Sequence, residues 1–189
     1  IQGSSTLLLQ DCAPNAQHVK LVFPARDNMP KVAMPEVEVH WYDGGMMPDR
    51  PEGFPQGKEL MGEGGGLCIF HGTKDTLICG CYGVNPWLLS GRKPNVPQTL
   101  HRVKDAMKGG HEQDWIRACK ESAGSRVQTK SNFLEAGPFN EMVVMGVLAV
   151  RLQRLNKELL WDGPNMRFTN IDPNETIKII KKDTFEVID

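Results

Sequence analysis

The stretch Leu67–Cys81, LCIFHGTKDTLICGC, predicts a β-hairpin and, with it, the type of fold. Two apolar arms, Leu67–His71 and Thr76–Cys81, flank the tetrapeptide Gly72–Asp75, whose composition is typical of a turn. Both arms have the length and the apolar residues of buried strands. The sequence therefore predicts an antiparallel pair of strands in this stretch.

The length of the turn sets the register of this hairpin. If the tetrapeptide is the loop, His71 pairs with Thr76 and Cys68 lies opposite Cys79. Both faces are then largely apolar, so we expect neither to meet bulk water. One face can take the domain's own helices, and the other needs another domain or another subunit. Of the two faces, one carries Cys68, Phe70, Leu77, Cys79 and Cys81, and the other carries Leu67, Ile69 and Ile78, with neither assigned to the helices.

Two stretches nearer the N-terminus show the alternation of half-buried strands. In His18–Phe23 (HVKLVF) and Glu36–Tyr42 (EVEVHWY), every second residue is apolar. We expect these two stretches to pair in antiparallel fashion, with one covered face and one wetter face. Residues 43–66 then form a long loop of Gly, Pro and charged residues, and loops of this length usually carry function or an interface.

Helices are expected later in the chain. His111–Glu121 has an apolar stripe at helical spacing, and Phe139–Leu155 follows Pro138, which is well placed to open a helix. The nine residues Met142–Val150 are apolar all round, which indicates a buried core helix too short to span a bilayer. Two more segments are a turn at Trp161–Asn165 between short extended pieces and a final helix at Glu175–Lys182.

This order of elements predicts an α+β fold. We expect an open-faced, predominantly antiparallel β-sheet with helices packed on one face, formed as a single domain over residues 1–189. No internal repeat is apparent in the sequence.

Composition narrows the class of protein. The 189 residues carry a net charge of −1 and are 40% hydrophobic, which is ordinary for a globular protein. So neutral a chain lacks the electrostatic footprint of a nucleic-acid or anionic-membrane partner, and we expect neither. The odd count of five cysteines argues against a disulfide framework and for a reducing compartment.

The first residue, Ile1, is no initiator methionine, so we expect a processed or truncated piece of a longer product. No signal peptide is visible at this end of the sequence. The localisation is therefore left open between cytoplasm and export to the periplasm.

Two local motifs favour ordinary structural roles. The glycines of residues 62–66 (GEGGG) lead into a strand, which fits neither a Walker loop nor a dinucleotide fingerprint. The hairpin residues Cys68, His71, Cys79 and Cys81 could in principle bind zinc, but His71 falls on the opposite face from the cysteines. A cross-strand Cys68–Cys79 disulfide is a further alternative, and packing as small core residues is the favoured one.

Four residues are candidates for substrate binding. Trp41, Tyr42 and Asp43 end a strand before Gly44-Gly45, and aromatic rings beside a carboxylate suit a sugar. The competing interpretation is that Trp41 is core, Tyr42 packs at the rim and Asp43 caps the turn. His111 is the fourth candidate, although its position first indicates the polar opening of a helix. We assign no catalytic, cofactor-binding or metal-binding residue.

Several segments taken together resemble the C-terminal α/β domain of Gfo/Idh/MocA-type oxidoreductases, the glucose–fructose oxidoreductase and inositol dehydrogenase group, in a subgroup common in Bacteroidetes-like bacteria. The resemblance runs from about Val19 to Pro173, and the tail Thr176–Asp189 departs from it. The segments that carry it are WYDGG (residues 41–45), PDRPEG (48–53), GGGLCIFHGTKDTLICGCYG (64–83), HEQDWIRACK (111–120), SNFLEAGPFNEMVVMG (131–146) and LWDGPNMRFTN (160–170).

This resemblance implies one part of a two-domain enzyme that acts on a sugar or polyol. An N-terminal Rossmann domain, not present in this sequence, would bind NAD or NADP and carry the catalytic lysine. Residues 1–189 would form the substrate and oligomerisation domain, with the missing domain and further copies of the chain as partners. No catalytic residue of the family can be carried onto this sequence, and the chain alone is not expected to be catalytic.

Two alternatives stay open. Part of the superfamily uses the same redox chemistry to cleave glycosides, so the parent protein could be an NAD-dependent glycosidase. A stand-alone, non-catalytic carbohydrate-binding or scaffold module is the other alternative.

Overall fold

The chain is an α+β protein, as the sequence predicts, with two α-helices and open antiparallel sheets among its described residues. The computed structural model describes residues 1–8, 12–27, 34–60, 66–97, 103–105, 108–172 and 174. The chain divides into two compact units, one formed by Ile1–Met46 with Asp105–Asp189 and the other by Met47–Lys104. Each unit is described by itself.

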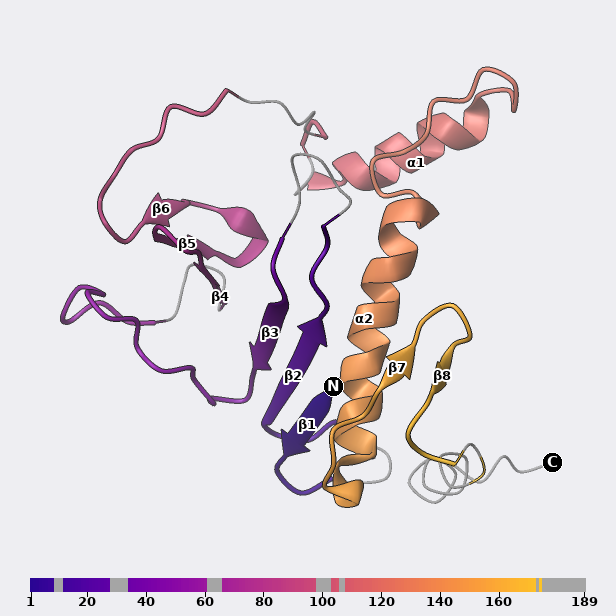
Figure 1. Cartoon of the computed structure of the whole chain (residues 1–189). Helices are drawn as coiled ribbons and strands as arrows, with labels where there is room; N and C mark the ends of the chain where they lie inside the picture. Colours follow the sequence, from indigo (N-terminus) through magenta and orange to yellow (C-terminus); the bar gives the residue numbers. More distant parts are fainter. Residues whose placement is uncertain are drawn as a thin grey trace. The chain divides into compact units, whose positions relative to one another are not determined.

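The first unit contains an antiparallel sheet of three strands in the order β1-β2-β3 (Figure 1). Its strands are β1 (Gln2–Ser5), β2 (Gln17–Phe23) and β3 (Val37–Tyr42). The two strands predicted from alternation are therefore confirmed, as is their antiparallel pairing. Their apolar positions share one face, where Val19 and Leu21 are buried.

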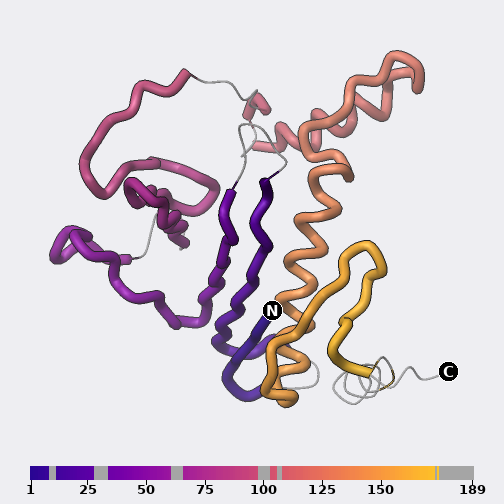
Figure 2. Tube along the Cα trace, viewed as in Figure 1, coloured from indigo at the N-terminus to yellow at the C-terminus, as the bar shows by residue number. Residues whose placement is uncertain are grey.

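Helix α2 (Phe133–Arg151) covers this apolar face, against β1 and β2. Figure 2 shows the start of the chain beside the helix. The approach is close, because a Cβ on Gly3 would lie only 2.6 Å from the backbone carbon of Ala149. Only glycine leaves room for this contact. The core formed here contains Val19, Leu21, Met145 and Val150.

The start of α2 differs from the prediction. The helix begins at Phe133, six residues before the expected Phe139, and Pro138 lies inside it. Asn132 supplies the N-cap, since its side-chain oxygen accepts a hydrogen bond from the Leu134 amide at 2.9 Å. A proline this near the start removes one intrahelical bond, the one to the Leu134 carbonyl, and the helix continues through it.

Met142–Val150 is helical as predicted, but only one side of this stretch is buried. Met145, Ala149 and Val150 are buried, but Val143, Val144 and Val147 are about half exposed. The length argument also fails, because the helix has 19 residues. By length and composition alone, α2 is the one helix among the described residues that could cross a membrane.

The first unit also contains helix α1, a short hairpin and a second small core. Helix α1 spans Gly110–Lys120, close to the predicted range, and a short hairpin joins β7 (Trp161–Asp162) to β8 (Arg167–Phe168). This hairpin confirms a turn between two extended pieces, but Trp161 and Asp162, which the prediction placed in the turn, form strand β7. The predicted helix at Glu175–Lys182 lies outside the described residues. Ala149, Leu152, Leu159 and Phe168 form the second core.

The second unit is built on the predicted hairpin at Leu67–Cys81. Strands β4 (Leu67–His71) and β5 (Thr76–Gly80) pair in the predicted register, with Cys68 opposite Cys79, and β6 (Trp87–Leu88) extends the sheet. A 3₁₀ turn follows β5 at Cys81–Gly83.

The two faces of this sheet differ within the unit. Ile78 is 0% exposed, and its neighbour Trp87 packs against Phe54 with ring centroids 5.8 Å apart. Phe54 comes from the long loop before the hairpin, so within this unit a loop residue packs on the face that carries Ile78. On the other face Phe70 is 57% exposed and Cys68 is also exposed.

Candidate functional site

The end of β3 is fixed by the carboxylate of Asp43. One carboxylate oxygen accepts a hydrogen bond from the Gln17 amide at 3.1 Å, and the other accepts from Gln17 Nε2 at 2.8 Å and Trp41 Nε1 at 2.9 Å. The chain then turns at Gly44, whose φ is +64° and whose added Cβ would lie 1.9 Å from the Asn15 carbonyl oxygen. The turn therefore needs glycine there and ties β3 to the start of β2.

Trp41 and Tyr42 lie on opposite faces of the sheet, because successive side chains of a strand alternate. Trp41 is 60% exposed, and its indole N–H is held by Asp43. Tyr42 is half-buried and packs on His18, with ring centroids 4.4 Å apart. The predicted aromatic pair is therefore divided, and Trp41 with Asp43 forms one corner while Tyr42 belongs to a different group.

That group is a row of polar side chains on the sheet face away from α2, which we call the polar row: His18, Lys20, Glu38, His40 and Tyr42. The Asp43 amide bonds the Gln17 carbonyl, so the next pair, His18 with Tyr42, is a non-hydrogen-bonded pair. Side chains of such pairs lie closer together, which explains the contact between these two rings.

Hydrogen bonds run along the polar row. Lys20 Nζ lies 2.7 Å from Glu38 Oε1, and Glu38 Oε2 lies 3.3 Å from His40 Nε2. His40 Nδ1 in turn lies 3.0 Å from His18 Nε2. If His40 donates its Nε2–H to Glu38, its Nδ1 is the acceptor and His18 Nε2 is the donor. Four side chains are thus joined in a single hydrogen-bonded chain.

Contacts within the polar row shift the pKa values of its side chains. The hydrogen bonds from Lys20 and His40 lower the pKa of Glu38, and the same contact with Glu38 raises the pKa of Lys20. Burial lowers the pKa of His18, and the neighbouring His40 and Lys20 lower it further. His18 is therefore neutral at pH 7, which fits its place in the chain of hydrogen bonds.

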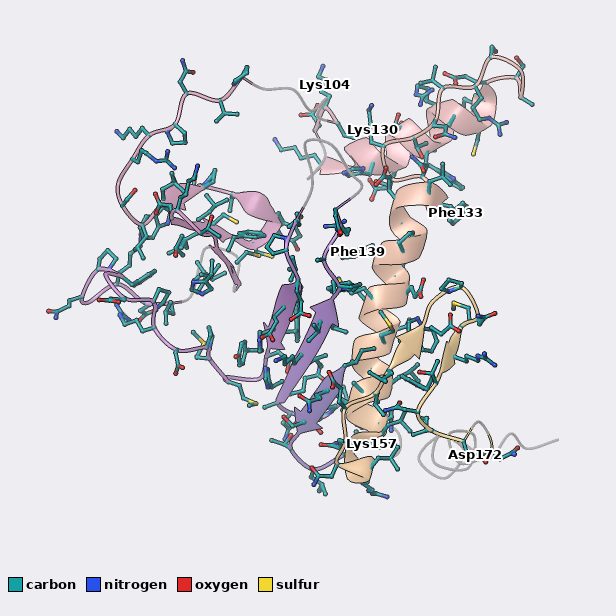
Figure 3. The ribbon with its side chains drawn as sticks, in the orientation of Figure 1. Lys104, Lys130, Phe133, Phe139, Lys157 and Asp172 are labelled. Atoms are coloured by element: carbon teal, nitrogen blue, oxygen red, sulfur yellow. The ribbon has the colours of Figure 1, made fainter. Side chains whose placement is uncertain are left out.

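The fourth candidate, His111, lies elsewhere. It is on α1, where its Nδ1 is 2.8 Å from Ser131 Oγ, just ahead of α2. The same helix is tied to this segment by the Lys130 amide, which donates to Asp114 at 2.9 Å (Figure 3 labels Lys130 beside α1). Trp41 instead pairs with Val19, which lies against Gly146 far along α2. The structure does not bring His111 together with the other three.

The polar row was missed because sequence reasoning treated these positions only as the wetter face of a strand pair. Two imidazoles and a phenol on alternating positions were a usable signal, but only the register places His18 beside Tyr42. Among the residues that the structure describes, no group of three or more His, Cys, Asp or Glu side chains is arranged to hold a metal ion.

No protein-family model matches this chain, and no curated protein matches it either. The resemblance to Gfo/Idh/MocA-type oxidoreductases therefore stays a prediction, which rests on the sequence motifs given above.

Proposed function

We propose that this chain is the substrate-binding and association part of an NAD(P)-dependent oxidoreductase that acts on a sugar or polyol. The observation that carries the proposal is the Trp41–Asp43 corner, where an exposed indole is held in one orientation at the end of a strand. The sequence motifs and the α+β fold with its open sheet support the same assignment.

An exposed, fixed indole suits a sugar ring. The face of a pyranose carries C–H groups that pack on an aromatic surface, and an aromatic side chain offers a large apolar area at its own face. Because Trp41 donates its N–H to Asp43, the ring loses little rotational freedom when a ligand arrives. Asp43 acts as a positioning residue in this proposal, since its carboxylate already accepts three hydrogen bonds within the chain.

The described residues do not fit the dinucleotide itself. A pyrophosphate site of the Rossmann type needs a strand, a glycine-rich turn and a helix in direct succession. Among the described elements, α1 follows the left-handed Gly109 and α2 follows the Asn132 cap, and neither helix begins directly after a strand. We therefore assign NAD or NADP to a separate domain and derive no chemical step through it.

The association surface in this proposal is the exposed face of the hairpin, with Phe70 at its centre. Phe70 is 57% exposed beside Leu77 and Cys79, and large apolar side chains in this position are typical of interfaces. The missing nucleotide-binding domain and a second copy of the chain are the two partners we propose.

The proposal is tested by titrating the chain with a panel of monosaccharides and polyols while observing the indole N–H signals by NMR. Trp41→Ala is the test variant, and Trp115→Ala is a matched control because Trp115 is 64% exposed but lies on α1. We expect saturable shifts of the Trp41 signal that survive in Trp115→Ala. The proposal fails if no member of the panel moves the Trp41 signal while the chain is folded.

A further inference from the structure

Three of the five cysteines gather on the hairpin of the second unit. Cys68 is on β4, Cys79 is on β5, and Cys81 follows β5 in the 3₁₀ turn. The other two, Cys12 and Cys119, are exposed and lie in the first unit. The hairpin thus holds a local concentration of thiols that the proposed function does not use.

Cys68 and Cys79 are placed for a covalent bond by the strand register. They are direct partners across β4 and β5, so their side chains leave the same face of the sheet. The Cys81 amide bonds the Gly66 carbonyl at 3.0 Å and the Gly72 amide bonds the Asp75 carbonyl at 3.0 Å. Hydrogen-bonded and non-hydrogen-bonded pairs alternate along an antiparallel ladder, and Cys68 with Cys79 is two pairs from the first of these bonds and four from the second. Cys68 and Cys79 are therefore a hydrogen-bonded pair.

The spacing of such a pair is compatible with a disulfide. Cα atoms of hydrogen-bonded antiparallel partners lie about 5.5 Å apart. Disulfides join residues whose Cα atoms are roughly 4.4–6.8 Å apart, with a mode near this value. The Cα spacing of this pair therefore lies in the range that a disulfide spans, and the Cys68 thiol is close enough to Cys79 to interact with it.

The two thiols differ in solvent exposure, and this difference indicates which of them reacts first. Cys68 is exposed, whereas Cys79 is only 5% exposed. An oxidant in solution therefore reaches Cys68 first, and Cys79 is the resolving thiol behind it. Burial raises the pKa of Cys68, and Cys79 and Cys81 raise it further, so its thiolate is scarce at neutral pH and the reaction needs mildly alkaline solution.

We propose that Cys68 and Cys79 are a reversible thiol–disulfide pair that cross-links β4 to β5. The co-reactant is a small disulfide of the glutathione type. The Cys68 thiolate attacks one sulfur of that disulfide, which breaks its S–S bond and releases one thiolate. The Cys79 thiolate then attacks Cys68 Sγ and releases the second. Two protein thiols lose two electrons, one disulfide is reduced to two thiols, and the released thiolates take up the two protons.

The experiment treats the full chain with oxidised glutathione at about pH 8.5, where a thiol of raised pKa is more fully ionised. Free thiols are then alkylated, and the chain is digested with trypsin. Lys74 separates the two cysteines, so the peptides 59–74 and 75–92 carry one side of the bridge each. We expect these two peptides to appear joined by a disulfide, and reduced glutathione to separate them and restore both thiols.

Variants distinguish this bridge from one through Cys81, which shares the second peptide with Cys79. We expect Cys81→Ser to form the bridge as the native chain does. In Cys79→Ser we expect the reaction to stop with one glutathione on Cys68. Cys79→Ala serves as a second variant, and circular dichroism shows which of the two retains native structure.

The exposed Cys12 and Cys119 act as internal controls, because their glutathione adducts show that the oxidant was active. The proposal is overturned if these two react and the two hairpin peptides stay separate. It is also overturned if the bridge persists in Cys79→Ser or Cys79→Ala through Cys81. Neither result would affect the sugar-binding proposal, which concerns Trp41 in the other unit.

Discussion

The indole N–H of Trp41 and the carboxylate of Asp43 meet at 2.9 Å across one intervening residue. Residues two apart on a strand share a face, and this geometry lets a turn residue hold the strand's last exposed ring. Asp43 also binds both the main chain and the side chain of Gln17. A single carboxylate therefore closes the strand pair and orients the candidate ligand-binding surface.

Replacing Asp43 by alanine is expected to lower stability first. Removal of the carboxylate leaves Gln17 and Trp41 without their acceptor, at a cost of about 1–3 kcal/mol. For a chain of this size, that lowers Tm by roughly 2–12 °C. Asp49→Ala, at an exposed position in the second unit, is the control and should leave Tm unchanged. Weakened sugar binding with an unchanged Tm would instead indicate that Asp43 contacts the ligand directly.

Stability is expected to fall as the pH drops below about 6.5, the ordinary pKa of histidine. The pKa of His18 is lower in the folded chain, so the unfolded chain takes up the proton first and gains relative stability. Glu38 acts in the same direction at lower pH, because its pKa lies below its ordinary value of 4.5. Urea unfolding at several pH values measures the slope. His18→Gln should flatten it between pH 5.5 and 7, and an unchanged slope would contradict this account.

Gly3→Ala is expected to weaken the packing of β1 on α2. The added methyl would meet the Ala149 backbone at 2.6 Å, and backbone cannot move aside as a flexible side chain can. Overpacking of this kind costs about 1–3 kcal/mol. Gly124→Ala is the matched control, because an added Cβ there meets nothing within 4 Å. Equal denaturation midpoints for the two variants would show that the close approach is relieved in solution.

The two faces of the hairpin should respond differently to a charge. Ile78 is 0% exposed, so Ile78→Asp places a carboxylate in the core of the second unit and should unfold it. Phe70 is exposed, so Phe70→Asp should keep the circular dichroism spectrum and change only self-association. Sedimentation velocity measures the second effect. An unaltered mass distribution for Phe70→Asp would remove the hairpin face as a self-association surface.

The isolated chain is expected not to bind NAD or NADP. Among the described elements, no strand is followed directly by a glycine-rich turn and a helix that could seat the pyrophosphate. Titration calorimetry with both nucleotides checks this, with a sugar titration as the parallel measurement. Micromolar binding of either nucleotide to this chain would overturn the assignment of the cofactor to a separate domain.

Alternation and turn composition were enough to predict strands β2 to β5 and the register of β4 with β5, because both are local properties. The short strands β1 and β6 were not predicted. Cys68 opposite Cys79 follows from the length of one turn. The start of α2 was predicted wrongly, because Pro138 was taken to open the helix. The helix instead begins after the N-cap residue Asn132 and continues through the proline. The exposure of the valines on α2 depends on which other elements pack against the helix, and the sequence of the helix alone does not determine that.

The candidate site was predicted less completely than the fold. Trp41 and Asp43 were identified as neighbours in a turn, and their hydrogen bond agrees with that. The polar row depends on contacts between strands some 20 residues apart, such as His18 with His40. His111 was grouped with Trp41, Tyr42 and Asp43 on residue type alone. In the structure it lies on α1, apart from these three residues.

Ser5 and Gln153 hold each other through two hydrogen bonds, of 2.9 and 2.7 Å, although 148 positions separate them along the chain. During synthesis on the ribosome, β1 can pair with β2 early, but its contacts with α2 and Gln153 must wait until most of the chain has emerged. The hairpin of the second unit needs only its own short turn. We expect nascent chains with residues 1–104 clear of the ribosome to protect β4 and β5 from proteolysis, and β1 to gain full protection only after Gln153 emerges.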